Sequence, residues 1–333
     1  MLLGDNKTTH LTNLIFLLAC LVIGFLLGRI PALRQREAHL VINTILLYVC
    51  LPAATVLYTS STVFERQYAL PILMPWLLFG GSFLFFRILR KPLKLHPHTE
   101  AVLILTAGIP SVSFVGFPIF ELLYGHEGMH IGVLMSQAGS FLVCSTLGVL
   151  LASYYARAAT RKSAGSEIET ANGSRHLNPA FLLDVLRFPT FIAFVIALII
   201  NLLGWKIPAL GVELLQKLAA PFSFLALVSV GMQIDFRAKD LNWKILGWGL
   251  GYKLIVAPLL VFLVFGLALQ QKGIIGQMSI LGAALGPMNT VAIIASNYGL
   301  NPKLAAQMVG IGIPLSLLTI AVGYGICHFL GYI

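Results

Sequence analysis

Two long apolar stretches are each interrupted by a proline and, just after it, by a pair of polar side chains. A proline inside a helix removes a backbone hydrogen bond and clashes with the preceding turn, so we expect each helix to break there. The helix that resumes begins with free N–H groups, a partial positive charge and cap-type side chains, which together can bind an anion. The residues predicted to bind a substrate are Pro110, Ser111 and Ser113 in "GIPSVSFVGFP", and Pro287, Asn289 and Thr290 in "LGPMNTVAI".

Three further polar residues inside apolar runs are candidates for binding or charge coupling. Gln137, in "LMSQAGS", either contacts the substrate or makes a hydrogen bond between helices, and Gln307 is its candidate partner in the second half of the chain. Lys253 is costly at membrane depth unless it faces water or a partner. It therefore attracts an anion, pairs with a carboxylate, or extends its ammonium group to the membrane surface.

The stretch "HEGMH" matches the zinc-binding pattern H-E-x-x-H, in which two histidines one helical turn apart hold the metal. An intramembrane zinc protease that uses His126, Glu127 and His130 is therefore an alternative function. Gly125 and Gly128 instead predict a loop at this place, and no third ligand is evident. We predict no bound metal.

The composition is that of a polytopic membrane protein. Hydrophobic residues make up 58% of the 333 residues and charged residues 10%, against about 25% charge in a soluble domain. The net charge of +10 sits in short loops between apolar runs, which excludes nucleic acid as a partner. Apolar runs of about 20 residues predict ten spanning helices, roughly 11–29, 38–60, 69–89, 99–124, 130–156, 186–204, 209–234, 244–269, 274–298 and 302–331.

Basic residues set the predicted orientation. The loops that follow odd-numbered spans hold 16 of the 22 lysines and arginines, so these loops face the cytoplasm and both termini lie outside. The expected location is the cell (inner) membrane. The polar linker 157–179 separates two five-helix halves, 1–156 and 180–333.

The two halves share motifs in the same order. "GRIPAL" after the first span recurs as "GWKIPAL" after the sixth, with Pro31 and Pro208 177 positions apart. Pro110 and Pro287 are also 177 positions apart, and each is followed by a Tyr-Gly pair. Because each half has an odd number of spans, the second half crosses the membrane in the opposite orientation to the first. Such inverted repeats are typical of secondary transporters. Both proline breaks then meet near the middle of the membrane.

Two segments, "IPSVSFVGFPIFELLYG" and "GPMNTVAIIASNYGLNPKLAAQMVGIGIPLSLLT", resemble the fourth and ninth helices of the auxin efflux carrier family. The resemblance extends over nearly the whole chain. It implies a fold like that of bile acid/sodium symporters, in which the fourth and ninth helices are broken and cross. In that family an Asn commonly follows the proline of the fourth helix. This chain has Ser111 at that position instead. The shorter side chains of Ser111 and Ser113 would then contact the substrate in place of the Asn amide.

The resemblance also implies how the helices divide. Spans 1, 2, 6 and 7 would form a scaffold that makes a homodimer, and spans 3–5 and 8–10 a transport domain. The substrate, a small organic anion such as a carboxylate, would bind at the crossing and move by an elevator motion.

We therefore expect a secondary transporter and not an enzyme. No P-loop is present, so no cofactor is predicted, and the coupling ion would be H⁺ or Na⁺. The predicted partners are the organic anion, the lipid bilayer and a second copy of the chain. A membrane sensor that binds a ligand at the same site without transporting it is the alternative.

Overall fold

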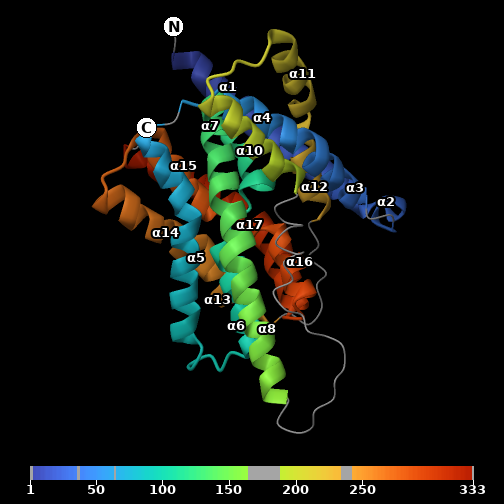
Figure 1. Cartoon of the computed structure of the whole chain (residues 1–333), viewed down its shortest axis with the longest axis vertical. Coiled ribbons are helices and arrows are strands. Elements are labelled where there is room, and N and C mark those ends of the chain that lie inside the picture. Colours follow the sequence, from blue (N-terminus) through green and yellow to red (C-terminus); the bar gives the residue numbers. More distant parts are fainter. Residues whose placement is uncertain (1–2, 36–37, 64, 164–187, 234–241, 332–333) are drawn as a thin grey trace.

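The computed structural model describes residues 3–35, 38–63, 65–163, 188–233 and 242–331. Within these ranges every regular element is a helix (Figure 1). Most of the predicted linker 157–179 lies outside the described residues. By length and composition, six helical stretches of the described chain can cross a membrane: Ala38–Ser60, Arg66–Leu89, Val112–Arg157, Ala209–Met232, Trp243–Ala268 and Pro302–Phe329.

The first half of the chain forms long helical rods with π-helical turns inside them. Its α-helices are α1 (Leu3–Arg29), α2 (Pro31–Gln35), α3 (Ala38–Ile45), α4 (Leu51–Ser60), α5 (Ala69–Leu89), α6 (Pro97–Gly108), α7 (Phe117–Leu134) and α8 (Val149–Ser163). The π-helical turns are η1 (Leu46–Cys50), η3 (Val112–Gly116), η4 (Met135–Phe141) and η5 (Cys144–Gly148), and η2 (Arg66–Tyr68) is a 3₁₀ turn.

The second half follows the same order with shorter pieces. Its α-helices are α10 (Pro189–Leu202), α11 (Ala209–Ala219), α12 (Phe222–Met232), α13 (Trp243–Gly251), α14 (Ala257–Val261), α15 (Gly273–Ala284), α16 (Asn289–Asn297) and α17 (Pro302–Phe329). The π-helical turns η6 (Tyr252–Val256) and η7 (Phe262–Ala268) flank α14. Each predicted apolar range is thus mostly helical where it is described, but the ranges around Pro110 and Pro287 are each divided in two.

One group of helices pairs the two halves crosswise. α1 packs against α12, and α4 packs against α10 and α11. The α1–α12 contact is close because both helices have glycines there: a Cβ on Gly24 would lie 2.2 Å from the Val228 carbonyl oxygen, and one on Gly231 would lie 2.4 Å from that of Leu21. Small residues at such crossings let two backbones pack together in lipid. We call α1, α3, α4 and α10–α12 the paired group.

Apart from the short α2, the other helices, α5–α8 and α13–α17, form the crossing group, named for the two proline breaks inside it. α5 packs on α6, α14 on α15, and α17 on both α15 and α16. In Figure 1, α3, α4, α11 and α12 lie at the upper right, whereas α5, α13 and α14 lie on the left. α7 contacts α1, α4 and α12, so it connects the two groups.

Candidate functional site

The first proline break separates α6 from η3. α6 ends at Gly108, and Ile109 has an extended backbone, with φ −116° and ψ 111°. Ser111 is bent, with φ −82° and ψ 70°, and η3 begins at Val112. The sequence predicted this break, because Pro110 cannot donate the hydrogen bond that a continuous helix needs at this position.

The second break separates α15 from α16. α15 ends at Ala284, and Leu285 and Met288 have extended backbones with ψ of 149° and 131°. α16 begins at Asn289, so the non-helical segment contains Gly286 and Pro287. Both predicted breaks are therefore present.

The two breaks pair with each other through their backbones. The Ser111 N–H donates to the Gly286 carbonyl at 2.9 Å, and the Met288 N–H donates to the Ile109 carbonyl at 3.1 Å. Pro110 and Pro287 lie directly opposite each other in an antiparallel bridge. In this type of pair the two central residues donate no hydrogen bond across the bridge, so proline is compatible with both positions.

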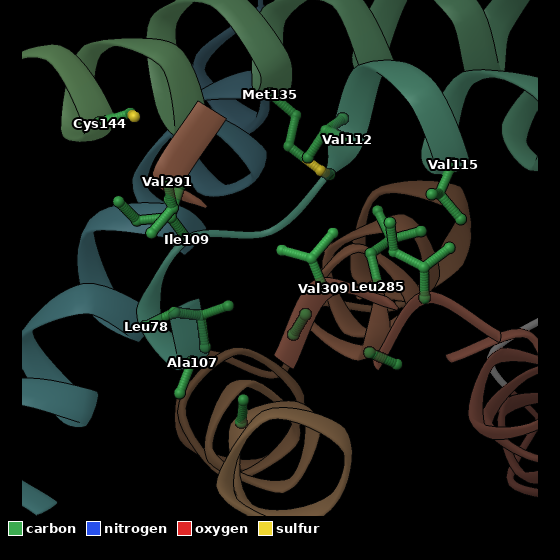
Figure 2. Close-up of a cluster of buried hydrophobic side chains, with 14 of the residues drawn as sticks. Leu78, Ala107, Ile109, Val112, Val115, Met135, Cys144, Leu285, Val291 and Val309 are labelled. Atoms are coloured by element: carbon green, nitrogen blue, oxygen red, sulfur yellow. The ribbon is translucent and has the colours of Figure 1, made fainter. Parts of the chain in front are cut away.

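Close packing holds this crossing in place. A Cβ on Gly286 would lie 2.8 Å from the Ile313 Cα, and one on Gly312 would lie 2.7 Å from the Pro287 Cδ. Figure 2 shows apolar side chains from several helices gathered around the crossing. All of those labelled there are buried: Leu78, Ala107, Ile109, Val112, Val115, Met135, Cys144, Leu285, Val291 and Val309.

A cavity of about 970 Å³ opens over the crossing, between the paired group and the crossing group. We call it the crossing cavity. The first turns of η3 and α16 line it, together with residues of α1, α3 and η4. Of the predicted binding residues, six line the cavity: Pro110, Ser111, Ser113, Gln137, Asn289 and Thr290. Pro287 is not among the lining residues and lies opposite Pro110 in the bridge.

Several buried polar atoms at this cavity have no hydrogen-bond partner in the described structure. They are the Gln137 Oε1, the Ser140 Oγ and the Asn289 Oδ1. The Ser113 hydroxyl differs, because it pairs with the Ser136 hydroxyl at 2.6 Å. A buried polar group without a partner costs about 1–3 kcal/mol, and a ligand that binds it recovers that cost. Gln137 and Asn289 are thus prepared to bind a polar ligand.

The ionisable side chains that line the crossing cavity are basic ones. Arg29 and His39 lie in its lining, and none of the described lining residues is an Asp or Glu. The Arg29 guanidinium lies 4.5 Å from the centre of the Phe25 ring, which also lines the cavity. The cavity therefore favours a negatively charged ligand.

The expectation that polar side chains cap the outgoing half-helices is wrong. The N-cap positions of η3 and α16 are Ser111 and Met288, and neither helix start receives a hydrogen bond from a capping side chain. Asn289 is the first residue inside α16. The first N–H groups of a helix have no partner within it, and here no capping side chain binds them, while residues of both helix starts line the cavity.

Lys253 and Gln307, the candidates for charge coupling, do not line the crossing cavity. Lys253 lies in η6, fully buried, and its Nζ has no hydrogen-bond partner among the described residues. Extension of its ammonium group to the membrane surface is therefore wrong for this conformation. Gln307 is half-buried on α17, whereas its neighbours Ala306 and Val309 do line the cavity.

The "HEGMH" stretch is helical, contrary to the predicted loop. It follows Gly125, whose φ of 59° bends α7. His126 and His130 both contact Tyr58 of α4, with ring centroids 5.9 and 5.3 Å away. Among the described residues, no group of three His, Cys, Asp or Glu side chains could hold a metal ion.

Sequence reasoning missed several residues of the cavity. Ser136 and Ser140 flank Gln137 in η4, and their spacing of four along a helix was a signal that they share a face. The sequence does not identify Arg29 and His39 as cavity residues, because their approach to the crossing depends on how α1 and α3 pack. Asn43, which also lines the cavity, accepts a hydrogen bond from Ser229 at 2.5 Å.

A bundle of apolar helices with paired breaks beneath a cavity is the arrangement of a membrane transport protein. The model of the membrane transport protein family matches residues 9–324, so the chain belongs to this family, as its resemblance to auxin efflux carriers predicted. The chain is 24% identical to the uncharacterized transporter YfdV of Escherichia coli (strain K12) over 311 residues, 92% of this chain and 94% of that protein. It is 23% identical to an uncharacterized transporter of Methanocaldococcus jannaschii over 320 residues, 93% and 96% of the two chains.

Proposed function

We propose that this protein is a secondary transporter of a small organic anion, which binds in the crossing cavity. The observation that carries the proposal is the meeting of two uncapped helix N-termini at one cavity that Arg29 also lines, with no Asp or Glu among its described lining residues. Each N-terminus stabilises a nearby anion by about 0.3–1 kcal/mol, and by up to about 2 kcal/mol when partly buried.

A carboxylate fits the polar groups of this cavity. Its oxygens would accept hydrogen bonds from the first N–H groups of η3 and α16, and from the side-chain NH2 groups of Asn289 and Gln137. Arg29 adds positive charge within the same lining. The apolar side chains around the crossing, such as Phe114 and Ile293, would accommodate the hydrocarbon part of the anion.

The crosswise pairing supports the ten-span inverted repeat. α1 packs on α12 while α4 packs on α10, so the first helix of each half contacts the second helix of the other. The Tyr-Gly pairs also match in conformation, since Gly125 and Gly299 have φ of 59° and 61°. A twofold relation between oppositely oriented halves accounts for both observations.

The position of the cavity supports an elevator motion. One wall belongs to the paired group, through Arg29 and Asn43, and the other to the crossing group, through Ser111 and Asn289. Movement of the crossing group against the paired group would carry a bound anion across the membrane. The positive-inside rule places the Arg29 end of the cavity at the cytoplasm and both termini outside the cell membrane.

The oligomeric state, the driving ion and the range of activity are proposed from the resemblance to the auxin efflux carrier family. The paired group, helices 1, 2, 6 and 7 of the ten-span reading, would form a homodimer in the bilayer. The driving ion would be H⁺ or Na⁺, with no other cofactor. Transport would be the whole activity of the chain, without enzymatic chemistry.

The test is transport by the purified full chain in proteoliposomes. A thermal-shift screen of mono- and dicarboxylates, with and without sodium, first identifies a ligand. Uptake or counterflow of that labelled ligand under proton or sodium gradients is the expected result. Asn289→Ala should abolish most of the flux, and Lys272→Ala, an exposed change before α15, should leave it unchanged. Ligand binding with no flux under any gradient would identify a sensor instead.

A further inference from the structure

The paired group gives the crossing cavity a wall with four neutral polar side chains among the described residues: Asn43, Thr44, Thr190 and Gln233. Three of them use their donors within the protein. The Thr44 hydroxyl donates to the Leu40 carbonyl at 2.8 Å, and the Thr190 hydroxyl donates to the Leu47 carbonyl at 3.2 Å. The Gln233 NH2 group donates to the carbonyl and to the hydroxyl of Ser229, at 3.1 and 3.3 Å. Asn43 is the exception in this wall.

The Asn43 side chain is held by its oxygen and not by its NH2 group. The Ser229 hydroxyl donates to the Asn43 Oδ1 at 2.5 Å. This separation occurs for an O–H···O bond but is too short for N–H···O, so the amide oxygen faces α12. The NH2 group makes no hydrogen bond within the described residues. Because Asn43 lines the cavity, this donor is available to a ligand.

A relay of hydrogen bonds fixes this orientation of Asn43. The Ser229 hydroxyl accepts from the Gln233 NH2 group, and its single proton goes to the Asn43 oxygen. Ser229 is fully buried, and its helix α12 packs against α3, which carries Asn43. The NH2 group is therefore preorganised, which lowers the conformational entropy lost when a ligand binds it.

The position of Asn43 in the membrane requires a partner for its free donor. Leu40, Val41 and Ile45 of the same helix are apolar and exposed, as expected for a helix surface in lipid. An amide among them is unfavourable unless it is hydrogen-bonded. A donor recognises an acceptor, and a carboxylate oxygen is a strong one. The absence of Asp and Glu from the described lining leaves that acceptor to come from the ligand.

We propose that Asn43 is a specificity-determining residue, whose NH2 group donates to a carboxylate oxygen of the transported anion. This inference rests on the proposed function and adds a contact from the paired group to those of the crossing group. The contact is made only while the crossing group lies against this part of the paired group. A ligand favours the conformation in which it makes more contacts, so Asn43 makes the bound anion stabilise the conformation described here.

The test compares each acid with its amide, by calorimetry on the purified full chain in detergent at pH 8. The pairs are acetate with acetamide, propionate with propionamide, and succinate with succinamate. Asn43→Asp keeps an acceptor for the Ser229 hydroxyl but replaces the free donor by a charged acceptor. The acid that binds the parent should bind this variant at least about 30-fold more weakly. Its amide, which can donate to the new carboxylate, should bind as well as before or better.

An exposed asparagine provides the matched control. Asn242 caps α13 by accepting a hydrogen bond from the Ile245 N–H at 3.3 Å, and aspartate caps a helix equally well. Asn242→Asp should leave acid binding unchanged, and an equal loss there would overturn the proposal, because added charge alone would explain it. An unchanged ratio of acid to amide affinity in Asn43→Asp would also overturn it. If the parent binds none of the acids, the proposed function itself fails.

Two further variants test the donor and the relay without adding charge. Asn43→Leu removes the donor and should weaken acid binding about tenfold, as expected for loss of a hydrogen bond to a charged group. Ser229→Ala leaves the Asn43 amide free to rotate and should weaken acid binding about threefold. A larger loss in Ser229→Ala than in Asn43→Leu would assign the contact to the serine and overturn the proposal.

Discussion

The two proline breaks have matching backbones but different side chains. Each contributes one N–H and one carbonyl to the bridge between Pro110 and Pro287. At the first break the Ser113 hydroxyl is satisfied by Ser136, whereas at the second the Asn289 Oδ1 has no partner in the described structure. A repeated backbone can therefore carry an asymmetric site, with one half structural and the other free to bind.

The largest effect should come from forcing the crossing apart at the second break. Gly286→Ala places a Cβ 2.8 Å from the Ile313 Cα, and a backbone atom cannot rotate away. We expect the free energy of unfolding to fall by about 3 kcal/mol, which is the upper end of the usual cost of adding a group to a well-packed core. Thermal unfolding in detergent measures it. Gly310→Ala, which meets nothing within 4 Å, is the control, and equal unfolding temperatures for the two variants would contradict the close crossing.

Removing the free amide should weaken ligand binding next most strongly. Asn289→Ala deletes a hydrogen-bonding group from the crossing cavity, and loss of a bond to a charged ligand costs about 2 kcal/mol, or roughly 30-fold in affinity. The carboxylate identified by thermal shift is titrated against each variant by calorimetry. Ser113→Ala should change affinity less than about threefold. A larger loss in Ser113→Ala than in Asn289→Ala would reverse the assignment of the two breaks.

The serine pair at the first break should show a smaller, non-additive effect on stability. Ser113→Ala leaves the buried Ser136 hydroxyl without its partner, which costs about 1–2 kcal/mol. Ser136→Ala combined with Ser113→Ala removes both groups, and the double variant should be closer to the parent than either single one. Thermal unfolding of the four proteins gives the coupling. Additive losses would show that the two hydroxyls act independently.

The smallest effect should be the difference between the two prolines. Pro110→Ala and Pro287→Ala each introduce a buried N–H that the bridge does not use, which costs about 1–3 kcal/mol. Since the backbone environment is the same at both, their unfolding free energies should agree within about 1 kcal/mol. A larger gap would mean that the bridge itself is asymmetric, and not merely the side chains around it.

The backbone of the site could be predicted from the sequence, but its side-chain partners could not. Pro110 and Pro287 identify the breaks because proline chemistry is local, and their equal spacing from Pro31 and Pro208 indicates that they meet. The Ser113 hydroxyl has a hydrogen-bond partner only because Ser136 reaches the crossing from another helix, and the sequence near Ser113 does not indicate this contact. The prediction that a polar side chain caps α16 was wrong for a similar reason. The Met288 N–H donates to the bridge, and this pairing places Met288 at the N-cap position.

The bend of α7 was only partly predictable. The sequence correctly marked Gly125 as an interruption, and its φ of 59° explains why glycine is needed there. Treatment of 125–129 as a loop was wrong, because His126 and His130 pack on Tyr58 and the helix resumes at once. A contact with α4 that fixes this turn has no signature in the local sequence.

The bridge between Pro110 and Pro287 also constrains how the protein is made. Its two strands are 177 residues apart, so the hydrogen bonds of Ser111 and Met288 form only after more than half of the remaining chain has been synthesised and inserted. Until then the carbonyl of Ile109 and the N–H of Ser111 lack their partners at a depth where unsatisfied backbone groups are costly. The first half is therefore inserted in the membrane with these backbone groups unpaired, and the crossing is completed only when the second half has been inserted.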